Sequence, residues 1–336
     1  MDKKTFIIAE VGQAHDGSLG ILHSFIDSLK DTGIDAIKFQ THIAEAESSM
    51  HEPFRINFSY EDSNRYDYWD RMGFTKDQWK LIKKHCDEID VEFMSTPFSN
   101  LAVDWLEEIG VKRYKVGSGD VSNYLLLEKI AKTNKEIIIS SGMSSFRELD
   151  KSIEFIRKFH NKISILQCTT SYPTKVENIG LNVINDLKTR YNFPIGFSDH
   201  SGLINTSLAA TTLGAEIIEF HVVFDKNMFG PDSSSSLTIN EVKKCVEGIR
   251  YIEKILKHKI NKNEVDIYKK EKRIFGKSLA FNRIMKAGDI IRFEDLEGKK
   301  PAQYGIPSDE FETIIGKKLK IDKKKWDFIN YEDLYD

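Results

Sequence analysis

Two histidines stand at the ends of neighbouring apolar runs of the sequence, His200 in FSDH and His221 in EFH. The two runs are consecutive members of a series of eight. Imidazole is the commonest side-chain ligand for metal ions, and two neutral imidazoles at the ends of adjacent strands can bind the same ion. The spacing indicates a two-histidine metal site, although two unrelated hydrogen-bonded histidines would give the same pattern.

Every run of the series ends in polar residues. The runs are FIIAEVG, DAIKFQTH, VEFMSTPF, RYKVGSGD, EIIISSGM, ISILQCTT, PIGFSDH and AEIIEFHVVF. Their closing residues are Glu10, Lys38 with Gln40, Ser95 with Thr96, Lys115 with Ser118, Ser140 with Ser141, Thr169 with Tyr172, Ser198 with His200, and Glu219 with His221. Any one of them could be only a turn former or a helix cap. Because all eight runs contribute, we expect them to form one site.

The elements that position these residues alternate regularly. Amphipathic stretches such as LGILHSFIDSLKDTG and FRELDKSIEFIRKFH separate the apolar runs, with apolar residues at three- and four-residue intervals. Strand and helix thus alternate eight times over residues 1–258, which predicts an α/β fold, a (β/α)8 TIM barrel. In such barrels the carboxyl ends of the strands form one catalytic rim.

Composition excludes several classes of protein. The chain has 336 residues, 40% hydrophobic and 30% charged, with a formal net charge of −3, which gives no bias toward nucleic acid or an anionic membrane. No run of about 18 apolar residues and no signal peptide is present, so we expect a cytoplasmic protein. Cys86, Cys168 and Cys245 lie far apart and predict no disulfide. Cys168 ends the sixth run, but with no histidine beside it in the sequence we expect a packing residue.

The C-terminal part has a different pattern. The lysine-rich segment 259–273 lacks apolar periodicity and is typical of a linker. Residues 274–336 hold short strands such as SLAFNRIM, a turn at Gly288-Asp289, and one-turn helices in FEDL and SDEFETII. A mostly-β domain of this size buries little core alone, so we expect it to dock on another surface. The lysines between Lys317 and Lys325 are expected to form a solvated face.

Several of these strings resemble those of the sialic acid synthase family, in the family's order and over nearly the whole chain. The matching segments are AEVGQAHDGS, IKFQTH, STPFS, YKVGSGD, SSGM, QCTTSYPT, IGFSDHSG, EFHVVFDKNMFGPD and the C-terminal GKSLAF, KAGDII and GKKL. The resemblance implies a TIM barrel followed by a SAF, or antifreeze-like, domain. It also implies condensation of phosphoenolpyruvate with an N-acylmannosamine-type aldose, N-acetylmannosamine or a diacetamido-trideoxyhexose, to a nine-carbon keto-deoxy acid and phosphate by C–O cleavage.

The resemblance also assigns roles to residues of the rim. It implies that His200 and His221 bind Mn2+, with Mg2+ or Co2+ as alternatives, and leave positions for water and the sugar carbonyl. It places Glu10, Lys38 and Gln40 in the catalytic rim, where a carboxylate could activate water and Lys38 could stabilise an anion. A buried Glu10–Lys38 salt bridge is the alternative for this pair.

Two substrate sites complete these assignments. The implied phosphoenolpyruvate-binding residues are Lys115, Ser118, Ser140, Ser198 and Thr96. The implied sugar-binding residues are Tyr172, Asp232, Glu219 and Lys300, of which Glu219 also supports the metal ligands and Lys300 comes from the small domain. The family further implies a domain-swapped homodimer in which each small domain caps the partner's barrel.

The chain departs from the family pattern at Ala14, Phe220, Asp120 and Lys300, where Asn, Arg, Glu and Arg are common. We interpret these departures as lying on the sugar side of the site. Two alternatives remain open. One is another phosphoenolpyruvate-condensing barrel, making seven- or eight-carbon acids, or a two-histidine metal aldolase. The other is an inactive barrel whose SAF-like domain binds ice or glycans.

Overall fold

The computed structural model describes residues 4–56 and 58–335, which form two compact units, Met1–His258 and Lys259–Asp336. In the first unit eight parallel strands follow one another in chain order, and β1 pairs with β8 to close a barrel. The strands are β1 (Phe6–Glu10), β2 (Ala36–Thr41), β3 (Glu92–Pro97), β4 (Arg113–Val116), β5 (Glu136–Ser140), β6 (Ile163–Cys168), β7 (Ile195–Asp199) and β8 (Ile217–Val223). A short β9 (Leu237–Thr238) pairs with the end of β8. The predicted (β/α)8 barrel is confirmed.

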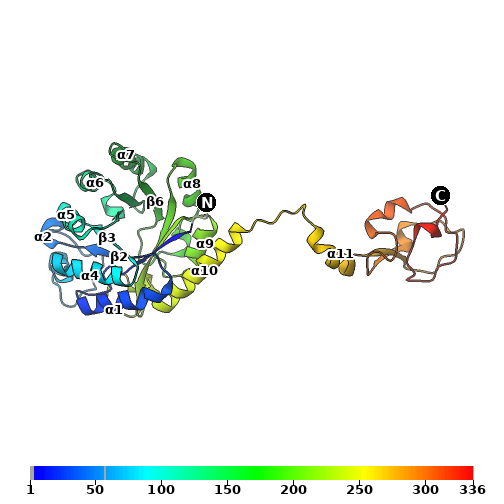
Figure 1. The fold of residues 1–336 in the computed structure, drawn as a ribbon, viewed down its shortest axis with the longest axis horizontal. Coiled ribbons are helices and arrows are strands. Elements are labelled where there is room, and N and C mark those ends of the chain that lie inside the picture. Colours follow the sequence, from blue (N-terminus) through cyan, green and yellow to red (C-terminus); the bar gives the residue numbers. More distant parts are fainter. Residues whose placement is uncertain (1–3, 57, 336) are drawn as a thin grey trace. The chain divides into compact units, whose positions relative to one another are not determined.

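Helices surround the strands of the first unit (Figure 1). They are α1 (Leu19–Leu29), α2 (Ala44–Glu47), α3 (Arg65–Met72), α4 (Lys76–Glu88), α5 (Asn100–Ile109), α6 (Tyr124–Ala131), α7 (Phe146–Arg157), α8 (Asn182–Arg190), α9 (Ile204–Thr212) and α10 (Ile239–Lys257). The 3-10 turns are η1 (Lys30–Thr32), η2 (Ser118–Asp120), η3 (Val176–Asn178) and η4 (Ser233–Ser235). Capping boxes at Thr75, Ser145 and Thr238 satisfy free N–H groups and set where α4, α7 and α10 begin.

Side chains inside the barrel form layers. The lower layer is apolar and buried, and it consists of Ile8, Ala36, Met94, Ile138, Leu166 and Ile217. Because side chains of a strand alternate between its two faces, the residue two positions later on each strand points into the same interior, one layer nearer the carboxyl rim. The apolar layer therefore forms the floor for whatever lies above it.

Gly196 of β7 is the tightest position near this layer. A β-carbon there would lie 2.4 Å from the carbonyl oxygen of Ile217 and 2.5 Å from Cδ2 of Leu166. We expect Gly196→Ala to lower the free energy of unfolding by about 1–3 kcal/mol, as overpacked cores do. Urea unfolding checks this, with Gly20→Ala in α1 as control because the nearest atom to its added carbon is 3.9 Å away. Equal stability of the two variants would contradict the prediction.

The second unit is small and mostly irregular. Its elements are η5 (Asp266–Tyr268), α11 (Lys269–Phe275), β10 (Ser278–Phe281), η6 (Phe293–Asp295), β11 (Leu296–Lys299), η7 (Ser308–Thr313) and η8 (Tyr331–Asp333), with β10 and β11 antiparallel. The 3-10 helices η6 and η7 lie where one-turn helices were expected. Residues 269–273 of the expected linker are helical, since Lys, Glu and Arg favour helix even without an apolar stripe.

The turn at Gly288-Asp289 is present, with Gly288 at φ 89°. A separate core of this unit includes Leu279, Phe281, Met285 and Ile291. Across residues 4–56 and 58–335, no helix has the length and apolar character needed to span a membrane.

Candidate active site

A polar layer lies directly above the apolar floor of the barrel. Two residues after the floor residues stand Glu10, Lys38, Thr96, Ser140, Cys168 and Glu219, and all are buried. Lys115 of β4 and Ser198 of β7 are buried as well. Side chains on the same face of a strand are two residues apart. The ring of apolar side chains is therefore followed, two residues later along the strands, by a ring of mostly ionic and hydroxyl groups.

Two lysines and two glutamates form the ionic part of this layer. Lys38 Nζ lies 2.8 Å from Glu10 Oε2 and 3.9 Å from Glu219 Oε2. Lys115 Nζ lies 3.3 Å from Glu219 Oε1 and donates to Ser140 Oγ at 2.7 Å. The buried Glu10–Lys38 salt bridge that was the alternative reading is therefore present, and it lies within the site.

Hydroxyl groups complete this layer. Ser198 Oγ donates to Glu219 Oε1 at 2.9 Å, and Lys38 Nζ donates to Thr96 Oγ1 at 3.3 Å. The structure thus places Glu219 with the two lysines and Ser198.

The two carboxylates of this layer differ in acidity. Burial would raise the pKa of Glu219, but Lys115 and Lys38 outweigh burial and hold that pKa at about 2. Burial raises the pKa of Glu10 above its ordinary value against the opposing attraction of Lys38. A buried carboxyl with a raised pKa suits a group that takes up a proton during a reaction.

A carboxylate oxygen of this layer lacks a hydrogen-bond partner. Glu219 Oε2 is buried and makes no hydrogen bond within the described part of the chain, since Lys38 Nζ is 3.9 Å away. Glu10 Oε2, in contrast, contacts Lys38 Nζ at 2.8 Å. Buried acceptors are nearly always satisfied, so the unpaired oxygen of Glu219 indicates a place for a water or a bound polar group.

The two histidines meet at the next level of the rim. Their ring centroids are 5.2 Å apart. Burial, reinforced by His200 and Lys38, lowers the pKa of His221 to about 3 although Asp232 opposes it, so this ring is neutral. His200 Nδ1 lies 2.9 Å from the carbonyl oxygen of Thr169, which leaves Nε2, 3.1 Å from the Tyr172 hydroxyl, as the nitrogen with a free lone pair when the ring is neutral.

These residues fit a weakly bound divalent cation. His221 Nδ1 lies 3.9 Å from Asp232 Oδ2, beyond hydrogen-bond distance. No third histidine, cysteine or carboxylate in residues 4–56 and 58–335 completes a protein-only metal cluster. A site of two imidazoles, once His200 has given up the proton that its raised pKa favours, leaves several coordination positions for water or substrate.

Cys168 lies closer to this pair than the sequence suggested. Its Sγ is 3.8 Å from His200 Nδ1 and 3.8 Å from Ser118 Oγ. Burial opposes ionisation, but His200 and Lys115 outweigh it and lower the pKa of the thiol. No histidine adjoins Cys168 in the sequence, but β7 brings His200 beside β6 although 32 positions separate the two residues.

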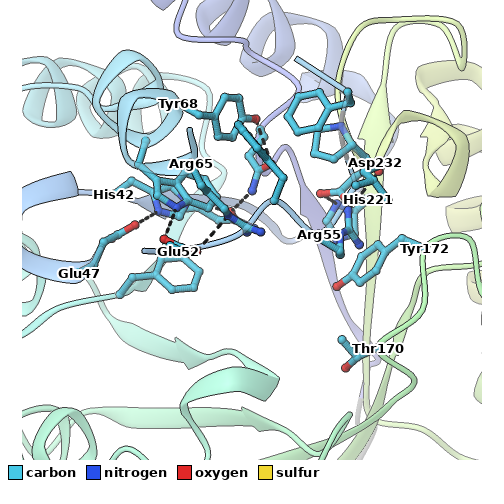
Figure 2. A pocket seen from close by; sticks show the side chains of 18 of the residues that line it. His42, Glu47, Glu52, Arg55, Arg65, Tyr68, Thr170, Tyr172, His221 and Asp232 are labelled. Carbon is cyan, nitrogen blue, oxygen red and sulfur yellow. Dashed lines mark hydrogen bonds and ion pairs between the residues drawn. The ribbon is translucent and has the colours of Figure 1, made fainter. Parts of the chain in front are cut away.

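A cavity of about 360 Å3 opens at this rim (Figure 2). Its lining includes Gln40, Tyr172, His221 and Asp232, all predicted from the sequence. The other predicted catalytic and phosphoenolpyruvate-binding residues are not part of the lining: they are mostly buried in the polar layer. One end of the cavity in Figure 2 holds His221, Tyr172 and Asp232, and the other holds His42, Glu47 and Arg65.

Sequence reasoning missed the residues that β2 and its following segment place in this cavity. Arg55 Nη2 donates to Asp232 Oδ1 at 2.5 Å and to the carbonyl oxygen of Pro231 at 3.1 Å, and its guanidinium lies 4.0 Å from the centre of the Tyr172 ring. Arg65 pairs with Glu52 at 3.0 Å. The signal available was a long, aromatic-rich connection between strands, since such connections are commonly functional.

The remaining predicted residues lie in different places. Ser118 is in η2 and contacts Cys168, and Asp120 lines the cavity, where burial raises its pKa. Phe220 is buried in the apolar layer between strands and helices, so the interpretation that this departure lies on the sugar side is wrong. Lys300 lies in the second unit, 5.2 Å from the Phe275 ring, and its contact with a sugar stays a prediction.

The chain is similar to characterised synthases along its length. The NeuB family profile matches residues 25–261. N,N'-diacetyllegionaminic acid synthase of Campylobacter jejuni is 35% identical over 321 residues, which cover 94% of this chain and 96% of that protein. Human N-acetylneuraminate-9-phosphate synthase is 31% identical over 340 residues, which cover 98% of this chain and 92% of that protein.

A solved structure shows the same likeness in three dimensions. The N-acetylneuraminic acid synthetase of Leptospira borgpetersenii, in complex with citrate, superposes with a TM-score of 0.72 and 33% sequence identity. The superposition covers 81% of this chain and 92% of that one.

Proposed function

The chain belongs to the NeuB family of sialic acid synthases, and we propose on this premise that it condenses phosphoenolpyruvate with an amino-sugar aldose. The products are a nine-carbon, sialic-acid-like keto-deoxy acid and phosphate. The observation that carries the proposal is the buried layer of Lys38, Lys115, Glu10 and Glu219 beneath a cavity that His221 and Tyr172 line. This arrangement offers cations for an enol phosphate, a carboxylate for water, and space for a sugar above them.

Phosphoenolpyruvate would bind at the polar layer. Its phosphate and carboxylate would take over hydrogen bonds that Lys115 and Lys38 now share with glutamates, with Ser118, Ser140, Ser198 and Thr96 as hydroxyl donors. C3 of the enol phosphate would attack the aldehyde carbon of the aldose, which forms the new C–C bond and leaves C2 electron-poor. Glu10, whose pKa is raised, would orient and deprotonate the water that attacks C2. The C2–O bond to phosphate then breaks as the keto group forms, and the two protons of the water end on the former aldehyde oxygen, by way of Glu10, and on the released phosphate.

His200 and His221 would hold the divalent cation, which we propose is Mn2+. When bound, the cation supplies Lewis acidity toward the aldehyde oxygen of the sugar. Tyr172 and Asp232 would orient the sugar beside it, which requires Arg55 to release Asp232 or to share it with a sugar hydroxyl.

The small second unit would complete the site in a dimer. We propose that residues 274–336 form a SAF domain that caps the barrel of a partner subunit and places Lys300 near the acyl group. The protein would act in the cytoplasm on small molecules.

Phosphate release in H2(18)O tests the proposed reaction. We expect phosphate only when phosphoenolpyruvate, Mn2+ and an N-acylmannosamine-type aldose are all present, with the label entering the keto acid. The panel holds N-acetylmannosamine, its 6-phosphate, a 2,4-diacetamido-trideoxyhexose, and the shorter aldose phosphates that seven- and eight-carbon synthases use. Label in the phosphate, or turnover of the shorter aldoses alone, would overturn the proposal.

Lys115→Met tests the anion site. A charge-assisted phosphate contact contributes about 1.5–3 kcal/mol, so we expect the KM for phosphoenolpyruvate to rise roughly tenfold to a hundredfold. The KM for the aldose should change little. Lys135→Met is the matched control because Lys135 pairs with Glu107 at the barrel exterior. Equal rises in both KM values would show that Lys115 is structural.

A further inference from the structure

His42 is a buried histidine at the edge of the cavity with both of its faces covered. Its ring stacks on Trp69, with centroids 3.9 Å apart and planes 16° apart. Phe98 covers the other face at 4.5 Å and 10°. The aromatic sandwich fixes the plane of the imidazole, so that only its two nitrogens are available for polar contacts.

Each nitrogen of His42 has one close side-chain partner, as the dashed lines of Figure 2 indicate for Glu47. Nδ1 lies 2.6 Å from Glu47 Oε1, and Nε2 lies 3.0 Å from Gln40 Oε1. The amide nitrogen of Gln40 in turn donates to Glu10 Oε1 at 2.8 Å. An unbroken chain of hydrogen bonds therefore connects the cavity edge to the carboxylate of the polar layer.

The orientation of the Gln40 amide determines where the protons lie. Glu10 contacts the Lys38 ammonium at 2.8 Å, so it is a carboxylate and can only accept. The NH2 group of Gln40 must face it, which turns the Gln40 oxygen toward His42. His42 therefore donates from Nε2.

A second proton must then lie on the other side of the ring. Two lone pairs at 2.6 Å would repel, so a proton lies between His42 Nδ1 and Glu47 Oε1. The side chain of Glu47 is only 6% exposed, and its Oε2 accepts the backbone N–H of Ile43 at 3.3 Å. The shared proton ties His42 to Glu47 by a short hydrogen bond, whichever of the two atoms holds it.

We propose that His42, held in place by its hydrogen bond to Glu47, is a positioning residue that keeps the Gln40 amide donating to Glu10. Gln13 Nε2 donates to the same Gln40 oxygen, at the longer distance of 3.2 Å. Without His42 only that longer contact is left to the oxygen among the described residues, so the Gln40 amide can rotate by about half a turn and present its oxygen to the Glu10 carboxylate. This rotation would repel the carboxylate and displace it from the water that it activates. The inference rests on the proposed function, which assigns that role to Glu10.

His42→Phe removes both nitrogens and keeps a flat ring between Trp69 and Phe98. We expect kcat to fall roughly tenfold to a hundredfold, because the residue that orients a reacting group is lost. The KM for phosphoenolpyruvate should stay within about twofold of the wild-type value. Glu47→Gln is the matched variant: a neutral ring can still donate from Nε2 to Gln40 while Nδ1 accepts from the new amide. It should lower kcat less than His42→Phe does.

NMR of ring-15N-labelled histidine in the wild-type protein tests the protons without any assay of activity. We expect Nε2 of His42 to carry a proton in the wild type and in Glu47→Gln alike. A neutral wild-type ring protonated at Nδ1 alone would overturn the proposal, as would unchanged kcat in a folded His42→Phe. If the wild type turns over no aldose, the proposed function fails, and the NMR result still decides the state of His42.

Discussion

His221→Ala is expected to lose turnover by about a thousandfold or more, because it removes one of only two imidazoles available to the proposed cation. Lewis acid stabilisation contributes several kcal/mol, and each 1.36 kcal/mol corresponds to a factor of ten in rate. Phosphate release at saturating phosphoenolpyruvate and aldose measures the loss. The neutral ring of His221, with its pKa at about 3, needs no deprotonation before it binds a metal.

Metal binding separates this explanation from a loss of structure. Wild-type protein treated with a chelator should regain activity with Mn2+, whereas His221→Ala should bind Mn2+ weakly in a titration and stay inactive. His23→Ala on α1 is the control, since His23 pairs with His85 away from the cavity. If chelation leaves the wild type fully active, the metal proposal is wrong and His221 acts in another way.

Truncation after residue 262 is expected to leave a folded barrel with roughly a hundredfold less turnover of the aldose. The barrel core runs from Ile7 to Ile249 and includes no residue of the second unit, so its stability should be kept. The loss follows from removing the group proposed to cap the sugar, because poorly placed substrates react about a hundredfold more slowly. Steady-state kinetics and thermal unfolding measure the two effects.

Hybrid dimers test whether the cap comes from a partner. Mixing the truncated chain with His221→Ala chains should restore part of the activity, because the truncated barrel receives an intact second unit from its partner. The same holds for Lys300→Ala mixed with His221→Ala. Full activity of the truncated barrel alone would show that the second unit is dispensable, and hybrids without activity would show that it acts within one chain.

The alternation of strands and helices was readable in the sequence because both periodicities are local. The apolar runs became eight strands of four to seven residues, and each run ended at the rim where its polar residues were expected. The period of two also determined that Glu10, Lys38 and Glu219 face the interior, since each follows an apolar floor residue by two positions. The same reasoning, applied to two neighbouring strands, predicted that the two histidines lie close together.

Contacts between non-neighbouring segments were decided only by the closed barrel. Arg55 meets Asp232 across 177 positions because β1 pairs with β8 and brings the connection after β2 close to the loop after β8. The segment that carries Arg55 has no regular period, so no pattern in the sequence indicates where its side chains point. The same holds for Cys168, whose histidine neighbour comes from the next strand.

The protonation of His42 shows the limit most clearly. The sequence places His42 two residues after Gln40, directly after the strand that carries Lys38, and determines that much by itself. The proton on its Nε2 follows from the orientation of the Gln40 amide and from the Lys38–Glu10 contact, neither of which a periodicity encodes. The sequence pattern determines which face of a strand a side chain lies on, whereas the residues that it contacts there depend on the packing of the whole barrel.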